Sequence, residues 1–526
     1  MTAPRVIFDL VAVQSPSYKG RGIARYSADF ARAMVRRHPD MVSSIAVHPE
    51  VGPLEGVDDL TNWLTTTPDW SEASILHLSS VFEPEVPVRV FWPRQATAHG
   101  LLTAVTLYDL IPDVFPGWYL EDPGLRRRWR SCREVVRAAD AVLTLSESAK
   151  QDTVALLGVP ERRVSVVGSG ISEAFRRPES RLAALEIARR GVEGLEPGFV
   201  LYQGAFNRRK NVDGLVEAYA LLPHTVIERH QLVIACDAAP LTRNHYLVMA
   251  ERLGLEGRIL ISGYVPEEVL VSLYQSTDLA VYPSLYEGFG LPVLESMACG
   301  APTIAGDNSS LREILPREAR FEPSDPEAIT QAMARGLTDT AFRARLAEIA
   351  RQEPPSWDAV ADKAATAFEA LAERWATSRP SWRRRPYLAL VGTPPELGDA
   401  MRAFASYDWF CTPGQRPERG FGALRERLAL SYNSLAKIDS WRGGYDAVVG
   451  WAPTADEPAL SVVEELARSW PDRTVVLVDR AAAFARRAVI SDWEARGLKV
   501  VAFGTGPGWE TTAAVLARRA WDNLVA

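Results

Sequence analysis

The stretch from Tyr282 to Glu295 constrains the fold of this chain more than any other. An apolar run, Asp278–Tyr282, leads into a loop with two glycines, and a helical pattern, Pro292–Cys299, follows it. The run predicts a buried strand, while Pro292 suits a first helical position and Gly300 suits a helix end. A helix that starts on a glycine loop presents free backbone N–H groups, which form a natural phosphate site.

The predicted anion site is bracketed by two carboxylates, Glu287 before the helix and Glu295 within it. Carboxylates accept hydrogen bonds from hydroxyl groups, so the pattern favours a phosphate flanked by sugar hydroxyls. Taken alone, two glutamates are equally typical of solvated helix residues. The residues expected at the phosphate are Gly288, Phe289, Gly290 and Leu291.

The whole string Glu-Gly-Phe-Gly-Leu-Pro-x-Leu-Glu, from Glu287 to Glu295, is far more specific. It resembles the Glu-x7-Glu signature of retaining, nucleotide-sugar-dependent glycosyltransferases of family 4. That family has the α/β GT-B fold, in which two Rossmann-like, doubly wound domains face a cleft. The resemblance implies that Glu287 holds hydroxyls of the donor sugar and that Glu295 holds the ribose.

The N-terminal part alternates apolar runs with helical patterns, which predicts a parallel, doubly wound sheet. Strand-like runs lie at 74–78, 88–92, 104–107 and 141–145. Ligands of such sheets bind at the carboxyl ends of the strands, and Tyr108 and Asp109 follow the third of these runs. They resemble the family's Val-His-Asp segment, with Tyr108 in place of the usual His. The resemblance implies that Asp109 contacts the acceptor substrate, although a role as a turn or helix-capping aspartate explains it equally well.

An earlier glycine loop carries Gly20 and Gly22 before a helix that extends to about Arg37. Such a loop alone is weak support for a ligand, because many turns between a strand and a helix contain glycine for packing. It resembles the first loop of the family, above all in members that build bacterial surface polysaccharides with mannosyltransferase-like sequences. The resemblance places Gly20 and Gly22 against the donor phosphates.

Cations follow the strand-like run Phe199–Gly204, in the sequence Arg208-Arg209-Lys210. A solvated loop would also carry such charges. Lys210 matches the lysine with which the family grips the donor diphosphate, and Arg209 takes the place of an arginine that relatives often carry where this chain has Ala205. Tyr264 and Val265 follow another short strand and resemble the segment that holds the nucleotide base through its backbone.

Length and composition set the remaining limits. The 526 residues suggest about three domains: 1–170 on the acceptor side, 171–378 for the nucleotide sugar with a helix crossing back, and an α/β domain, 379–526, of unknown role. A net charge of −7 argues against nucleic acid as a partner. The 4 cysteines show no metal or disulfide spacing, and no apolar run reaches the ~18 residues of a membrane helix. We expect a cytoplasmic protein, at most peripheral on the inner membrane face.

The reaction implied by the resemblance is transfer of a sugar from a nucleoside diphosphate sugar, with GDP-mannose as the first donor to test, to a glycan or lipid-linked glycan of the cell surface. Asp109, Arg209, Lys210 and Glu287 would carry the chemistry, with neither a metal nor another cofactor. Two alternatives stay open: a GT-B disaccharide phosphorylase or synthase, and a catalytically silent GT-B scaffold whose C-terminal domain binds pathway partners. Replacing Glu287 by Ala is expected to abolish transfer with little change in melting temperature.

Overall fold

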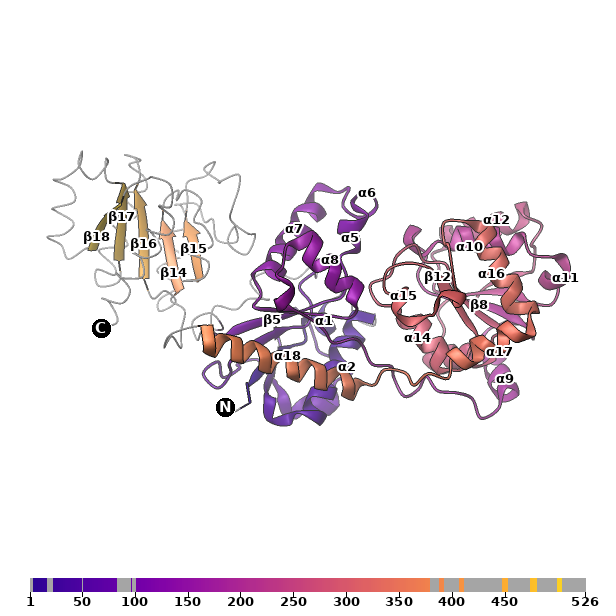
Figure 1. The fold of residues 1–526 in the computed structure, drawn as a ribbon, viewed down its shortest axis with the longest axis horizontal. Coiled ribbons are helices and arrows are strands. Elements are labelled where there is room, and N and C mark those ends of the chain that lie inside the picture. Colours follow the sequence, from indigo (N-terminus) through magenta and orange to yellow (C-terminus); the bar gives the residue numbers. More distant parts are fainter. Residues whose placement is uncertain are drawn as a thin grey trace.

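The computed structural model describes residues 3–16, 22–49, 51–82, 96 and 101–378, together with five strands between 387 and 503. Gly20 and the predicted strand 88–92 lie outside the described residues. Three parallel sheets organise the described chain, one for each part of the sequence (Figure 1).

The first half of the molecule is built on a seven-stranded sheet in the order β3-β2-β1-β4-β5-β6-β7. Every residue of β1 and β5 is buried, as expected for parallel strands that are covered on both faces. The strands are β1 Val6–Asp9, β2 Val42–Ala46, β3 Leu64–Thr65, β4 Ile75–Leu78, β5 Leu102–Leu107, β6 Ala141–Thr144 and β7 Val164–Val166. The helices between them are α1 Val11–Gln14, α2 Gly22–Arg37, α5 Ile111–Val114, α6 Pro116–Tyr119, α7 Pro123–Ala138 and α8 Glu147–Leu157, with the 3-10 turns η1 Pro39–Met41, η2 Asp58–Trp63 and η3 Glu161–Arg163.

The second half is built on a six-stranded sheet in the order β10-β9-β8-β11-β12-β13. Its strands are β8 Phe199–Gln203, β9 Gln231–Ala235, β10 Ile259–Ile261, β11 Leu279–Tyr282, β12 Thr303–Gly306 and β13 Arg320–Phe321. Its helices are α9 Arg181–Gly191, α10 Val212–Ala220, α11 His224–Ile227, α12 Pro240–Arg252, α13 Glu267–Ser276, α14 Leu291–Ala298, α15 Leu311–Ile314, α16 Pro326–Thr338 and α17 Thr340–Ile349, with the 3-10 turns η4 Arg208–Lys210 and η5 Arg317–Ala319.

The long helix α18, Trp357–Ser378, follows the second half in sequence but packs on the first (Figure 1). Its Phe368 is fully buried, with its ring 6.1 Å from that of Phe8 in β1. Arg37 at the end of α2 pairs with Asp362 of α18 at 2.9 Å. The first half therefore takes its last helix from beyond the second half.

The chain crosses between the halves twice, and the two crossings touch. The N–H of Ile171 donates to the carbonyl of Pro355 at 3.1 Å. A Cβ on Gly170 would lie 2.5 Å from the ring of Trp357, so only glycine fits beside the start of α18. The two crossings thus form one paired connection.

The third sheet has the order β15-β14-β16-β17-β18 and is parallel throughout. Its strands are β14 Tyr387–Val391, β15 Ser406–Phe410, β16 Ala447–Ala452, β17 Thr474–Asp479 and β18 Lys499–Phe503. A parallel sheet agrees with the predicted α/β class of the C-terminal part. In the part of the chain that the structure describes, no helix is long and apolar enough to span a membrane.

Candidate functional site

The loop between β11 and α14 has the predicted form of a strand, a glycine turn and a helix. Gly290 is the N-cap of α14 with φ 107°, and a Cβ there would lie 2.9 Å from Leu311. Both facts demand glycine. The backbone N–H groups of Phe289, Gly290 and Leu291 donate no hydrogen bond to another described residue. They remain available to an anion at the start of the helix.

Glu287 lies between two cations of the 3-10 turn η4. The Nζ of Lys210 is 2.6 Å from its Oε1, and a guanidinium nitrogen of Arg209 is 2.7 Å from its Oε2. The three side chains are only 12–13% exposed. The sequence predicted these three residues at one site, but it did not predict that they pair with one another.

Local hydrogen bonds hold this cluster in place from both sides. Asn207 caps η4 by accepting from the N–H of Lys210 at 3.2 Å, and the N–H of Leu285 donates to the carbonyl of Arg209 at 2.7 Å. Ser309 Oγ accepts from the N–H of Glu287, and Ser310 Oγ donates to its carbonyl, at 2.8 and 2.9 Å. The backbone on both sides of the ion pairs is therefore fixed.

The cluster has an excess of positive charge, which keeps Glu287 ionised. Burial alone would raise the pKa of Glu287, but Lys210 and Arg209 outweigh it and hold the pKa at about 2. For the nearby Asp109, burial raises the pKa despite a hydrogen bond from the N–H of Ile111 and the charge of Arg209. Two cations facing one firmly ionised carboxylate suit a ligand that brings negative charge of its own.

Glu295, eight positions further on, is also buried, and its partner comes from the other half. A guanidinium nitrogen of Arg25 in α2 lies 2.7 Å from its Oε1, while the side chain of Glu295 is 5% exposed. Another nitrogen of Arg25 is 3.4 Å from Glu267 at the start of α13. Sequence reasoning did not single out Arg25. Its place three residues after Gly22 was visible, but nothing local pointed to a partner 270 positions away.

Tyr108 and Asp109 meet the glycine loop of the other half, Tyr108 through its carbonyl oxygen and Asp109 through its side chain. A Cβ on Gly288 would lie 2.9 Å from the Tyr108 carbonyl oxygen and 2.7 Å from Asp109 Cβ. The Tyr108 hydroxyl donates to the carbonyl of Ser79 at 3.0 Å. The Tyr108 side chain is therefore anchored within the first half while its carbonyl faces Gly288. Asp109 accepts from the N–H of Ile111 at 3.0 Å, so the turn-capping alternative holds, and Asp109 also lies near Arg209 and Glu287.

The remaining predicted residues are less closely grouped. Gly22 opens α2, three residues before Arg25. Val265 is half-buried and packs against the core of the second half. The Tyr264 side chain is 80% exposed, which agrees with the expectation that any contact of this segment is made through its backbone.

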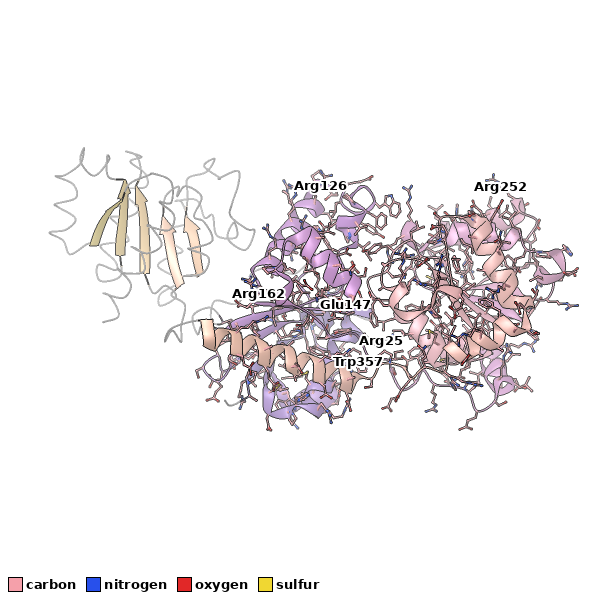
Figure 2. All side chains as sticks on the ribbon, in the orientation of Figure 1. Arg25, Arg126, Glu147, Arg162, Arg252 and Trp357 are labelled. Carbon is pink, nitrogen blue, oxygen red and sulfur yellow. The ribbon has the colours of Figure 1, made fainter. Side chains whose placement is uncertain are left out.

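Further contacts that the sequence did not reveal join the two halves beside this site. Ser146 Oγ donates to the carbonyl of Gly288 at 2.7 Å. The carboxylate of Glu313 in α15 accepts from the N–H groups of Glu147 and Ser148 at the start of α8, at 3.0 and 2.8 Å. Figure 2 shows Glu147, Arg25 and Trp357 on the side of the first half that faces the second. Hydroxyl and carboxylate partners of this kind carry no sequence motif, so only the fold reveals them.

Comparison with known proteins agrees with this architecture. A family model described as glycosyl transferases group 1 matches residues 186–353. The serotype-specific mannosyltransferase WbdA of Escherichia coli is 32% identical over 279 residues, 51% of this chain and 33% of that protein. The chain thus spans about a third of the length of that relative. O-antigen chain mannosyltransferase B of Escherichia coli is 30% identical over 285 residues, 53% of this chain and 73% of that protein.

A solved structure shows the same fold at low sequence identity. Sucrose-phosphate synthase from Thermosynechococcus elongatus superimposes with a TM-score of 0.51 at 19% identity, covering 72% of this chain and 100% of that one. The described chain has two parallel-sheet, Rossmann-like halves that meet at a glycine loop and share a helix that crosses back, and the second half carries the charge cluster. On these grounds the chain belongs to the group 1 glycosyltransferases and has the GT-B fold.

Proposed function

We propose that this glycosyltransferase moves a sugar from a nucleoside diphosphate sugar to a hydroxyl of a glycan or lipid-linked glycan, with retention of the anomeric configuration, as in family 4. The observation that carries the proposal is the buried cluster of Glu287, Lys210 and Arg209 beside the free N–H groups that open α14. It combines an anion site with a fixed carboxylate.

The chemical difficulty of this reaction is the negative charge that develops on the departing diphosphate. Fixed cations and N–H groups aimed at that charge lower the barrier without reorganising during the step. In this chain Lys210, Arg209 and the N–H groups of Phe289, Gly290 and Leu291 would face the diphosphate. We propose that they supply the positive charge without a metal ion.

Glu287 and Glu295 would accept hydrogen bonds from hydroxyl groups on either side of the diphosphate. The low pKa of Glu287 means that it stays ionised, because a proton would first have to overcome two cations at 2.6 and 2.7 Å. We therefore assign Glu287 to the donor sugar as an acceptor of hydrogen bonds and not as a proton donor. Asp109, whose pKa is raised by burial, stands on the acceptor side.

The proposed donor is GDP-mannose, and the proposed pathway is the synthesis of a surface polysaccharide. The two Escherichia coli relatives described above are named mannosyltransferases, and one of them is named for the O-antigen chain. These names support mannose as the sugar and a growing glycan as the acceptor.

The test is the release of nucleoside diphosphate from a panel of nucleotide sugars in the presence of a lipid-linked glycan extract. We expect release from GDP-mannose by the wild type and roughly a 10²-fold lower rate for Lys210→Gln, because that change removes a cation from the leaving group. Lys150→Gln is the matched control, since Lys150 pairs with the exposed Glu161.

Other outcomes would contradict the proposal in distinct ways. Nucleotide binding without release from any donor supports a silent scaffold. Turnover that requires inorganic phosphate supports a phosphorylase. Equal rates for Lys210→Gln and Lys150→Gln would show that the charge cluster does not contribute to the reaction.

A further inference from the structure

Arg25 is the charged residue that links the first half directly to the buried carboxylate of α14. It lies in the first turns of α2, on the side that faces the second half (Figure 2). One guanidinium nitrogen is 2.7 Å from Glu295, and the guanidinium carbon lies 5.9 Å from the ring centre of Phe175, a residue in the core of the second half. The head of Arg25 is thus held by the second half while its backbone belongs to the first.

We propose that Arg25 is a positioning residue that acts through Glu295, keeping this carboxylate charged and oriented for the donor ribose so that donor binding depends on contact between the two halves. The inference rests on the proposed function, which assigns Glu295 to the ribose. It adds that Arg25 orients Glu295. Because Arg25 belongs to the first half and Glu295 to the second, donor binding would depend on the two halves being in contact.

Arg25 contacts one carboxylate oxygen of Glu295, so the other oxygen is available to a ligand. The guanidinium contact is to Oε1, and Oε2 accepts no hydrogen bond from another described residue. A carboxylate held at one oxygen by a planar guanidinium keeps its orientation, while the second oxygen can accept from a hydroxyl. Ribose hydroxyls would therefore meet an acceptor that is already oriented.

The charge of Glu295 depends on the same contact. Burial raises the pKa of Glu295, the charge and the hydrogen bond of Arg25 lower it, and the charge of Glu267 raises it. The groups that face Glu295 from the surrounding elements are Arg25, Glu267, Tyr274, Tyr282 and Cys299. Among these Arg25 is the cation, so its loss would leave a buried carboxylate that is protonated more readily.

This arrangement predicts pKa changes of opposite sign for two substitutions. Arg25→Gln removes the stabilising cation, so the pKa of Glu295 rises and its charge is lost at a higher pH. Glu267→Gln removes the like charge, so the pKa of Glu295 falls. Arg25→Lys keeps a cation and is expected to restore most of the wild-type value. A role of Arg25 in packing alone would predict no such pattern.

The first measurement uses the full chain without nucleotide. Protein labelled with carboxyl-carbon-13 glutamate is titrated by NMR, and Glu295→Gln identifies the signal of Glu295. We expect the titration midpoint to be highest in Arg25→Gln, intermediate in the wild type and Arg25→Lys, and lowest in Glu267→Gln. The same midpoint in Arg25→Gln and the wild type would overturn the inference.

The second measurement is binding of GDP, with UDP in parallel, by calorimetry at pH 5.5 and pH 8. For Arg25→Gln we expect the loss of affinity relative to the wild type to be larger at pH 5.5 than at pH 8, because the raised pKa leaves more of the Glu295 carboxylate protonated at the lower pH. A loss that is equal at both pH values would contradict the role of Arg25 through Glu295.

These two measurements separate the inference from the proposed function. If the wild type binds neither nucleotide, the proposed function fails, and the carboxyl titration still decides whether Arg25 controls Glu295. If the wild type binds nucleotide and the titration midpoints do not differ, the proposed function stands and the inference fails.

Discussion

Glu287 is the residue at which charge, burial and stability are most closely connected. Replacing it by Gln leaves Lys210 and Arg209 buried without a carboxylate, because their side chains are 12–13% exposed. Breaking a buried ion pair on one side costs about 3–5 kcal/mol, so we expect Glu287→Gln to lower the free energy of unfolding by that order. Urea denaturation followed by circular dichroism measures it.

Glu318→Gln is the control for this prediction. Glu318 pairs with Arg345 at the surface, where the two side chains are 39% and 49% exposed, and such exposed pairs contribute little to the free energy of unfolding. Equal losses of stability in the two variants would show that the Glu287 cluster contributes no more than a surface pair.

The same carboxylate predicts a dependence of stability on pH. Its pKa is about 2 in the folded chain against 4.5 for an ordinary glutamate, so its contribution is complete above pH 4.5 and is lost as the pH falls toward 2. Glu287→Gln should therefore lose less stability than the wild type between pH 4.5 and pH 3. Parallel losses of melting temperature in this window would contradict the assignment.

The sequence identified Glu287, Glu295 and Lys210 because they stand at motif positions, but their partners are set by the fold. Lys210 and Glu287 are 77 positions apart, and Arg25 and Glu295 are 270 apart. No local pattern encodes such pairs. The expectation that Glu287→Ala would leave the melting temperature nearly unchanged did not include the buried ion pairs of Glu287, and these pairs change that expectation.

At the level of elements, the loop that carries Gly288 packs tightly against the end of β5. An Ala at this position would place its Cβ 2.7 Å from Asp109 Cβ and 2.9 Å from the Tyr108 carbonyl oxygen, so the halves would have to separate. We expect Gly288→Ala to fold, to increase the radius of gyration in small-angle X-ray scattering, and to slow transfer roughly 10²-fold through misplacement.

Gly117→Ala is the matched control for Gly288→Ala. Gly117 lies in α6, and a Cβ there meets nothing within 4 Å. If Gly288→Ala and Gly117→Ala give the same scattering curve as the wild type, the contact between Gly288 and the end of β5 does not limit closure.

Helix α8 is capped by a residue of the other half, so the capping contact reports whether the two halves are closed against each other. Glu313 accepts from the N–H groups of Glu147 and Ser148, a contact that exists only while the halves touch. Replacing a capping group costs about 1 kcal/mol, so we expect Glu313→Gln to weaken closure by that order. Fluorescence energy transfer between dyes on α7 and α12 measures the closed fraction, and an unchanged fraction would exclude the cap as a closing contact.

The elements themselves were largely predictable from sequence. Buried apolar runs identified β5, β8 and β11 to within two residues, and glycine with Pro292 identified the start of α14 to within one. The capping of α8 by Glu313 was not predictable, because Ser146 and the following residues already explain that helix start locally.

For the whole molecule, α18 decides which fragments can fold. Val360, Ala361, Ala364 and Phe368 are at most 2% exposed within the core of the first half. We expect a chain of residues 1–378 to unfold cooperatively and to keep nucleotide turnover. A chain of residues 1–356 would expose that core and should be insoluble or bind hydrophobic dyes. Calorimetry and dye fluorescence compare them, and a stable 1–356 fragment would contradict the prediction.

The return of α18 to the first half also has a consequence during protein synthesis. The last strand of the first sheet ends at Val166, but the helix that covers its core begins only at Trp357. At a translation rate of about 5–20 residues per second, the ribosome needs roughly 10–40 s to make the intervening chain. Throughout that interval the first half lacks the helix that covers its core, so we expect the second half to fold first. A nascent chain arrested just before α18 is therefore the species that molecular chaperones would have most reason to bind.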